Sequence, residues 1–554
     1  MCRRLAFCCI VLVMCGGCGA PQEIVPEALH LSYLRDKESY EELFRMTRAT
    51  SAEPIREQVI GGVVPHHMFV GHEIARLYET LRLQSPSIVV IIGPNHFSQG
   101  RSAIQTTDHG YETPYGTVDI AMDVVRDLEK SGIAQIEPTT FDTEHSISTH
   151  VVFIKRTFPQ ARVVPIVMSA GASGLQTTAL AAALDKYLPK DALVLASVDF
   201  SHYLPPDVAA FHDDYAEAVM EQFAFEHVRN LEIDSAPSIE TFLSYLTLRK
   251  AQNIAYEHHT NSADFIVGSV PAETTSHFFM AFTKGKPQSY PFSTLLFFGD
   301  TITGRGIADQ LATGEDPLKA MRGDENRFFR GISVVGANLE GPLTTEAKNN
   351  KKIVSFAFDP VSTIALLKGM GLTVASIANN HIDDAGPQGM KDTVTFLQQA
   401  GIKAAGYPDP CTVMTVIHGT MAICAFADLS GVLDLERASE AIRAVRSQTD
   451  FLVVSIHWGT EYSQKPTDRQ RLLSTEFMNA GADAVIGHGP HVVQPIEWIH
   501  GKPVLYSVGN FLFDQPDPKL SNGIAAGLTF SGSTVSLRIF PLHTAGGRPR
   551  LEKP

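Results

Sequence analysis

The chain has 554 residues, more than a single hydrophobic core usually supports, so its length predicts two or more domains. Its composition, 44% hydrophobic and 19% charged, is that of a folded globular protein. The formal net charge of -15 and the lack of a basic stripe argue against general electrostatic attraction to nucleic acid, so we expect no nucleic-acid partner. An anionic substrate would need a metal ion or a local basic pocket.

The first residues have the layout of a secretory signal. Two arginines precede an apolar stretch over residues 5–14, which is too short to span a bilayer, and small residues follow. The sequence CGGC at 15–18 resembles a bacterial lipoprotein processing site, with Cys18 as the lipidated residue and Cys15 as the alternative. Lipid on Cys18 would anchor an exported protein to the membrane of the cell envelope without a spanning helix. A plain signal peptide cleaved nearby is the other interpretation.

Cysteine usage excludes a disulfide-rich scaffold. Five of the seven cysteines lie in this leader, and only Cys411 and Cys424 remain in the body of the chain. These two could form one disulfide in an oxidising compartment or stay as buried thiols, and the sequence leaves both open.

After a signal peptide over 1–18 and a polar tether over 19–57, a first domain is predicted over 58–285. Its apolar runs are short and rich in β-branched residues, and helical stretches such as HEIARLYETLRL and TTALAAALDKYL separate them; the runs are VIGGVVPHH, SIVVIIGPNH, RVVPIVMS and ALVLASVDFSH. Continuous apolar strands that alternate with helices predict a largely parallel sheet covered on both faces.

A second α/β series is predicted over 290–550, after a linker, GKPQSYP, at 285–291. Its strands are STLLFFGD, ISVVGANLEG, TVASIANNH, MAICAFADLS, FLVVSIHWG, ADAVIGHGPH and PVLYSVGNFLF, with helices such as PVSTIALLKGMG and MKDTVTFLQQAG between several of them.

In the second half, nearly every apolar run ends in a polar or metal-capable residue. These residues are Asp300, Asn338, Glu340, Asn380, His381, His457, His488 and His491. Because ligands of open parallel sheets bind beyond the carboxyl ends of the strands, the pattern predicts a site there, and an inert polar rim is the alternative. Carboxylate, amide and imidazole donors suit Mn, Fe or Zn, which would activate water, and a nearby unligated histidine could protonate a leaving group.

The same motifs resemble the bacterial capsule-synthesis CapA family, the poly-γ-glutamate capsule proteins, from about residue 292 to 540. The motifs are FFGD, GANLEGPL, ANNHIDDAGPQG, SIHWGTEY, GHGPHVVQPIE and LYSVGNFLFDQ. That family is similar to calcineurin-like metallophosphoesterases, so the resemblance implies a four-layer α/β/β/α sandwich around a two-metal site.

By this resemblance, His381 would be the catalytic acid and six residues would be metal ligands: Asp300, Glu340, Asn380, His457, His488 and His491. Two positions depart from the phosphoesterase pattern. Ile302 stands where a histidine is usual, and Glu340 stands where an aspartate is usual. The resemblance implies a role in capsule or poly-γ-glutamate handling without establishing hydrolysis.

The first half shows strand-end residues of the same kind, namely His66, His96, His145, Asp199 and His202. Together with YETPYGTVDIAMD, their motifs resemble the Memo family, also called AmmeMemoRadiSam system protein B, over about 59–285. Memo proteins look like class III extradiol dioxygenases. The resemblance therefore implies a site with Fe, Zn or Cu, in which His66 and His96 are ligands and the other three line the pocket.

One departure bears on the metal of this half. The family usually offers a cysteine ligand, and the matching stretch here is DSAPSIETF, with Ser235 and Ala236. No cysteine lies between Cys18 and Cys411, which disfavours a soft copper site and leaves a histidine-based Fe or Zn site or a domain that only binds.

The sequence thus predicts an exported, lipid-anchored, two-domain protein of the cell envelope. We expect a metal-dependent hydrolase-type protein that acts on a phosphoester or on an anionic polymer such as capsule poly-γ-glutamate, together with capsule machinery. A non-catalytic scaffold for polymer export is one alternative, and dioxygenase-like redox chemistry in the first half is another.

Overall fold

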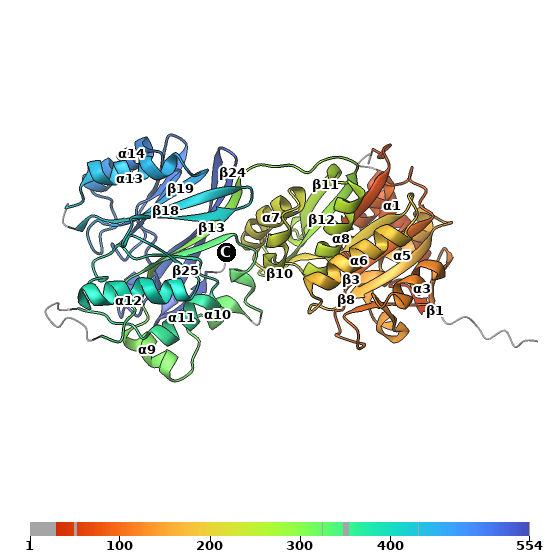
Figure 1. The fold of residues 1–554 in the computed structure, drawn as a ribbon, viewed down its shortest axis with the longest axis horizontal. Coiled ribbons are helices and arrows are strands. Elements are labelled where there is room, and N and C mark those ends of the chain that lie inside the picture. Colours follow the sequence, from red (N-terminus) through yellow and green to blue (C-terminus); the bar gives the residue numbers. More distant parts are fainter. Residues whose placement is uncertain (1–28, 49–52, 324, 347–353, 430–431, 553–554) are drawn as a thin grey trace, which may run out of the picture.

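The computed structural model describes residues 29–48, 53–323, 325–346, 354–429 and 432–552. The predicted lipidation residue, Cys18, lies outside the described residues. Figure 1 shows two α/β halves side by side, the N-terminal one in red to yellow and the C-terminal one in green to blue. In the described part of the chain, no helix combines the length and apolar character needed to cross a membrane.

The N-terminal half is built on a nine-stranded sheet with the order β10-β12-β2-β9-β3-β8-β4-β7, in which β11 pairs with β12. Its centre is parallel, as predicted, and consists of β2 (Val59–Val64), β9 (Leu193–Ser197), β3 (Ile88–Pro94) and β8 (Arg162–Met168). The outer strands are β4 (Ile104–Thr106), β7 (Gln135–Ile136), β10 (Phe200–Leu204), β11 (Asn253–Asn261) and β12 (Thr274–Thr283).

Helices flank this sheet because the strand residues are apolar on both faces. They are α2 (Gly71–Thr80), α3 (Met122–Lys130), α4 (His145–Ser148), α5 (His150–Thr157), α6 (Gly174–Tyr187), α7 (Pro206–Glu221) and α8 (Ala236–Arg249). A small separate sheet joins β1 (Leu29–Leu31), β5 (Gly110–Thr113) and β6 (Gly116–Val118).

Part of the segment that we expected to be a polar tether belongs to this half. β1 pairs in parallel with β5, and α1 (Lys37–Arg48) packs on the core through Tyr40 and Phe44, whose rings both contact Phe153. Tyr40 and Phe44 are four residues apart, so they share one face of the helix, and both are buried.

The C-terminal half is a sandwich of two sheets. The first has the order β16-β15-β14-β13-β24-β25-β26, with β23 paired to β13, and the second has the order β17-β18-β19-β20-β22-β21. One apolar cluster fills the space between the sheets, and two others lie beneath the helices on the outer faces. The layers are therefore α/β/β/α, which confirms the predicted fold class.

The first sheet comprises β13 (Phe292–Thr301), β14 (Val334–Leu339), β15 (Val374–Ser376), β16 (Lys403–Ala405), β23 (Asn510–Leu512), β24 (Asn522–Ser531), β25 (Thr534–Ala545) and β26 (Arg548–Leu551). The second comprises β17 (Cys411–Val416), β18 (Gly419–Ala427), β19 (Phe451–His457), β20 (Ala484–His488), β21 (Ile496–Ile499) and β22 (Lys502–Leu505). The helices are α9 (Arg305–Ala312), α10 (Lys319–Arg322), α11 (Pro360–Gly369), α12 (Gly386–Gln399), α13 (Leu435–Arg446) and α14 (Asp468–Ala480).

Cys411 and Cys424 form a disulfide, an outcome that the sequence left open. The two residues lie directly opposite each other in the antiparallel pair β17–β18, so the bond links neighbouring strands at the edge of the second sheet.

The two halves meet along α7, which Figure 1 shows between them. Val208 and Phe211 of α7 belong to an apolar cluster of the C-terminal half, whereas Tyr215 and Val219 of the same helix belong to the N-terminal core. The predicted linker is also docked, since Tyr290 donates a hydrogen bond from its hydroxyl to Glu221 at the end of α7.

Candidate metal centres

The first candidate site lies at the carboxyl edge of the N-terminal sheet. β2, β9 and β3 are neighbouring parallel strands, and each is followed, two residues after its last residue, by one of the predicted site residues. These are His66 after β2, Asp199 after β9 and His96 after β3. The common direction of the strands brings the three side chains to the same place, as expected for an open α/β sheet.

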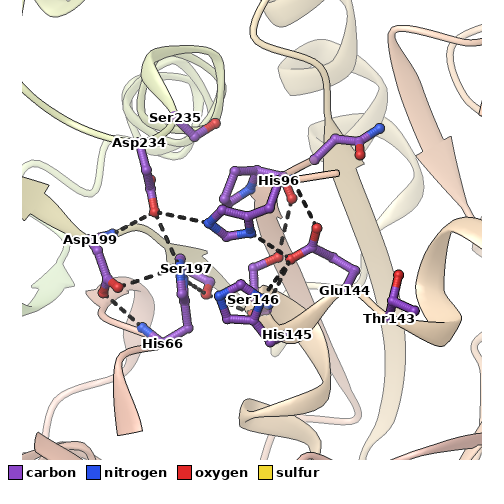
Figure 2. A network of polar contacts seen from close by, with 12 residues as sticks. His66, His96, Thr143, Glu144, His145, Ser146, Ser197, Asp199, Asp234 and Ser235 are labelled. Carbon is purple, nitrogen blue, oxygen red and sulfur yellow. Dashed lines mark hydrogen bonds and ion pairs between the residues drawn. The ribbon is translucent and has the colours of Figure 1, made fainter. Parts of the chain in front are cut away.

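Figure 2 shows these residues converging with Glu144, His145 and Asp234. The Oδ2 atom of Asp234 lies 3.2 Å from His66 Nε2 and 3.7 Å from His96 Nε2, and Asp199 Oδ2 lies 3.4 Å from His66 Nε2. Two groups of potential donor atoms result: His66 with His96 and His145, and His66 with Asp199 and Asp234.

The hydrogen bonds of Ser197 define the orientation of the His66 ring. The Ser197 hydroxyl donates to the carbonyl of Ser146 at 2.7 Å, so its oxygen accepts from His66 Nδ1 at 3.0 Å and from His150 Nε2 at 3.1 Å. His66 Nε2 is then the nitrogen that faces the two carboxylates. A bare lone pair there would be repelled, so the geometry calls for a proton or a metal cation between Nε2 and the carboxylates.

The electrostatics support the same conclusion. Burial lowers the pKa of His66, but Asp199 and Asp234 outweigh this effect and raise it. Burial also lowers the pKa of His96, but hydrogen bonds to Asp234 and Glu144 outweigh it and raise the pKa to about 10. Burial and these two imidazolium rings lower the pKa of His145 to about 4, so its ring is neutral at pH 7. A divalent cation could therefore replace protons on His66 and His96.

Of the five predicted residues of this half, the structure brings all five into one neighbourhood. His202 joins the group through its Nε2, which lies 4.0 Å from Asp199 Oδ2. Sequence reasoning missed Asp234. The signal was present, since Asp234 begins the DSAPSIETF stretch that stands where the Memo family offers its cysteine; the next residue, Ser235, caps α8 with its side chain.

The second candidate site lies between the two sheets of the C-terminal half, at their carboxyl edges. Asp300 in β13 is paired in register with Asn338 of β14 on one side and with Asn510 of β23 on the other. In the second sheet, His457 ends β19 and is paired in register with His488, which ends β20. The strand-end residues of both sheets thus face a common space.

Asp300, Glu340 and His491 form the centre of this site, with donor atoms within 4.8 Å of one another. His491 Nδ1 lies 3.1 Å from Asp300 Oδ2 and 2.9 Å from Asn510 Oδ1, and its Nε2 lies 3.8 Å from Glu340 Oε1. Asn338 donates to Asp300 Oδ1 at 2.7 Å, which fixes the carboxylate.

Without a bound cation, protons must balance the charges at this centre. Glu340 is 1% exposed, and among the described residues neither of its carboxylate oxygens has a hydrogen-bond partner. Burial and the charge of Asp300 raise the pKa of Glu340 well above its usual range. Burial lowers the pKa of His491, but the nearby Glu340 and Asp300 outweigh this effect and raise it to about 10. A metal ion would balance these carboxylates and displace the proton of His491.

His457 and His488 are held in the neutral form, in which an imidazole nitrogen can bind a metal ion. Burial lowers the pKa of His457 to about 3 and that of His488 to about 4. His488 Nδ1 lies 3.6 Å from Asp300 Oδ1, and neither ring nitrogen of His488 has a hydrogen-bond partner within the described ranges. A fully buried imidazole without partners is costly, and coordination of a metal would satisfy it.

Asn380 and His381 follow β15 and are linked to the centre through Asn379. Asn379 donates to Asn338 Oδ1 at 3.1 Å and accepts from the backbone N–H of His381 at 3.1 Å. The ring of His381 bonds through Nδ1 to Asp384 Oδ2 at 2.7 Å.

Asp384 and Asn510 are site residues that sequence reasoning did not single out. Both lie within quoted motifs, Asp384 three residues after His381 and Asn510 at the start of the NFLF strand. Ile302, which stands where phosphoesterases usually have a histidine, is fully buried in an apolar cluster.

Comparison with known proteins agrees with these two halves. Residues 29–266 match the family model for Memo-like protein, and residues 294–515 match the model for bacterial capsule synthesis protein PGA_cap. PGA biosynthesis protein CapA of Bacillus subtilis is 36% identical over 255 residues, which cover 42% of this chain and 66% of that protein. A MEMO1 family protein of Caldivirga maquilingensis is 34% identical over 166 residues, which cover 28% of this chain and 58% of that protein.

The chain thus spans somewhat under two thirds of the length of each of these relatives. Among solved structures, a novel phosphatase of Mycoplasma pneumoniae is 13% identical, with 46% of this chain and 94% of that one covered and a TM-score of 0.31. The chain thus combines a region similar to Memo-like proteins with a region similar to bacterial capsule-synthesis proteins of the CapA type.

Proposed function

We propose that the C-terminal half is a metal-dependent hydrolase that acts on a phosphoester or on an anionic polymer of the poly-γ-glutamate type during capsule synthesis or anchoring. The observation that carries the proposal is the Asp300–Glu340–His491 centre, where three buried donor groups lie within 4.8 Å of one another and the Glu340 oxygens have no hydrogen-bond partner among the described residues. The capsule-synthesis names of the CapA relatives support the class of substrate.

The donor set suits Mn, Fe or Zn, since it combines carboxylate, amide and imidazole groups and contains no thiolate. When bound, such an ion would polarise the substrate oxygen and lower the pKa of a water molecule. The chain's own contribution is positional. Asn338 and the backbone N–H of Gly489, the latter at 3.3 Å, both donate to Asp300 and hold its carboxylate in place.

His381 is the proposed general acid. Its Nδ1–H donates to Asp384, which leaves Nε2 as the nitrogen that can carry a second proton and deliver it to a leaving group. Asp384 is buried, also accepts from the backbone N–H of Phe356 at 2.7 Å, and therefore stabilises the charged form of the ring from a fixed position. The Phe356 ring packs against His381 with a centroid distance of 4.5 Å and limits its rotation.

The test combines metal analysis of the soluble protein with phosphodiesterase and γ-glutamyl hydrolase assays. Wild type should bind Mn, Fe or Zn and turn over one of the substrates, and His381→Ala should keep the metal while losing about 100-fold or more of the rate. His500→Ala, a change at an exposed histidine of the same half, is the matched control and should behave as wild type. If wild type neither binds metal nor turns over substrate, the protein is a non-catalytic scaffold for polymer export.

At the cell, we propose an exported protein held at the envelope by lipid on Cys18, in contact with capsule machinery. Labelling of cells with a palmitate analogue should mark wild type and leave Cys18→Ala unmarked. Labelling of both would place the lipid elsewhere, and labelling of neither would favour a plain signal peptide.

The N-terminal half supports a second candidate function, non-haem metal chemistry of the dioxygenase-like kind. The observation that favours it is the carboxylate of Asp234 beside His66 and His96, because two histidines and one carboxylate form the donor set of many Fe(II) oxygenases. Without a thiolate, Fe or Zn is favoured over Cu.

The test is metal binding by two neighbouring variants. Asp234→Ala should weaken Fe(II) binding about tenfold or more, whereas Ser235→Ala, which only removes a helix cap, should not. Asp234→Cys should shift the preference toward Cu(I). Equal Fe(II) binding by wild type and Asp234→Ala would refute the assignment.

A further inference from the structure

The segment that carries Asp234 into the N-terminal site is held by the other half of the chain. Glu232 lies two residues before Asp234, and its side chain is fully buried. Its Oε1 accepts from Arg327 Nη1 at 2.7 Å, and its Oε2 lies 3.4 Å from Arg330 Nε. Both arginines belong to the C-terminal half.

The contact is made by backbone as well as by side chains. The N–H of Gly331 donates to the carbonyl of Asn230 at 2.8 Å, and Arg330 Nη2 donates to the carbonyl of Leu231 at 3.4 Å. Residues 327–331 therefore run alongside residues 230–232. An added Cβ at Gly331 would approach the Cβ of Glu232 to 3.1 Å, so the two segments are in close contact.

From Glu232 the chain passes directly into the site. The carbonyl of Glu232 accepts from the N–H of Ser201 at 2.9 Å, and the N–H of Asp234 donates to the carbonyl of Asp199 at 3.2 Å. The Oδ2 of Asp234 in turn accepts from the N–H of Asp199 at 3.1 Å. The position of Glu232 is thus transmitted to the Asp234 carboxylate through a short stretch held by backbone hydrogen bonds.

Arg327 also contacts the segment that carries His202. Its guanidinium lies 5.3 Å from the centre of the Tyr203 ring, and Tyr203 follows His202 directly. One side chain of the C-terminal half therefore touches the two segments that supply Asp234 and His202.

We propose that Arg327 and Arg330 are positioning residues of the N-terminal metal site, and that docking of the capsule-synthesis half sets the place of Asp234. The metal-binding part rests on the proposed function of the N-terminal half. Loss of Arg327 would leave the buried carboxylate of Glu232 without its main partner, and the segment would move to solvate it. Groups that orient metal ligands from outside the coordination sphere typically change metal affinity 10- to 100-fold.

The test uses the full chain and three variants. Arg327→Met removes the charge and keeps a long apolar side chain, and Arg327→Lys keeps the charge. Arg538→Met is the control, because Arg538 forms another ion pair between the halves, with Asp214, whose carboxylate, unlike that of Glu232, is partly exposed. Co²⁺ is the probe, and its binding is followed by absorbance. The part of the absorbance change that is present in wild type and missing in His96→Ala is assigned to the N-terminal site.

Two measurements are made on each variant: the Kd for Co²⁺ at the N-terminal site, and hydrogen–deuterium exchange of residues 231–235 in metal-free protein. We expect Arg327→Met to raise the Kd at least tenfold and to speed exchange in this segment, with partial rescue in Arg327→Lys and no effect in Arg538→Met.

Unchanged exchange in Arg327→Met, or faster exchange with an unchanged Kd, overturns the proposal. Equal effects of Arg327→Met and Arg538→Met also overturn it, because they would reflect general loosening of the halves. If wild type binds no Co²⁺ at this site, the proposed metal function fails. Hydrogen–deuterium exchange then tests by itself whether Arg327 positions the segment. That part of the proposal stands if Arg327→Met selectively speeds exchange of residues 231–235, and it is refuted otherwise.

Discussion

Replacement of Glu340 by glutamine should change the stability of the metal-free and metal-bound protein in opposite directions. The Glu340 side chain is buried beside Asp300, and in the described part of the chain its oxygens have no hydrogen-bond partner. Without metal, the glutamate must either remain protonated or oppose the charge of Asp300, and Glu340→Gln removes that conflict with little change of shape. With metal, the variant loses an anionic ligand.

The size of both effects follows from the environment of the carboxylate. At pH 7.5 the folded wild type must either take up a proton on Glu340 or bury a second charge beside Asp300, at a cost of about 1.4 kcal/mol per pH unit above the usual glutamate pKa, so Glu340→Gln should raise the free energy of unfolding of the metal-free protein by about 1–3 kcal/mol. Wild type should gain about 2.7 kcal/mol from Mn²⁺ at 100 times its Kd, and the variant should gain much less at the same concentration.

The effect in metal-free protein depends on pH. Because burial and Asp300 raise the pKa of Glu340 in the folded state above 4.5, the folded protein holds the proton longer than the unfolded chain. Stability therefore falls as pH rises above about 4.5, and Glu340→Gln should remove this dependence.

Calorimetric unfolding in EDTA and in MnCl₂, repeated from pH 5 to pH 8, measures these quantities. Glu346→Gln, at an exposed glutamate six residues further on, is the control and should change neither. The reasoning fails if Glu340→Gln destabilises the metal-free protein, or if Mn²⁺ stabilises the variant as much as it stabilises wild type.

Three further outcomes are expected. Mn²⁺ binding at the C-terminal site should release protons, because the pKa of His491 is raised to about 10 and the metal must displace that proton. The affinity should therefore fall about tenfold per pH unit for each proton released as the pH is lowered. Titration calorimetry in two buffers measures the release, and binding without it would contradict the prediction. Replacement of Cys411 and Cys424 by serine should lower the stability of the oxidised protein by about 2–3 kcal/mol, because the bond closes a loop with a sequence separation of 13, and an equal loss in dithiothreitol-treated wild type would confirm the cause. Burial and the neighbouring Glu217 and Glu221 raise the pKa of Glu257 to about 8, so the folded state loses stability as pH rises from about 4.5 to 8, and Glu257→Gln should recover about 1 kcal/mol at pH 8.5 because the group is partly exposed; a gain at pH 4 instead would contradict this.

The sequence predicted the residues that directly follow apolar strands and missed Asp234, which does not. His66, His96 and Asp199 each follow a continuous apolar run by two residues, so both the strand and the direction of its end can be read locally. Asp234 comes from an irregular segment before α8, and only the pairing of this segment with β10 and the strand end at Asp199 brings it to the site.

The same reason explains the rest of what the sequence could not supply. The disulfide requires Cys411 and Cys424 to face each other across two strands, which depends on the register of the hairpin. The sequence predicts a polar tether with some helical character where α1 lies, because the stretch is mostly polar; that α1 packs on the core follows only from the contact of Tyr40 and Phe44 with Phe153, which is distant in sequence.

The shared position of α7 has a consequence for attempts to divide the chain. Families drawn from sequence suggest a cut between residues 266 and 294, but a cut there would strip Val208 and Phe211 of their apolar neighbours in one fragment and uncover the matching surface in the other. Expressed separately, each fragment would expose an apolar surface to solvent and tend to aggregate. Because α7 serves the cores of both halves, a substitution that unfolds this helix should destabilise the two halves together.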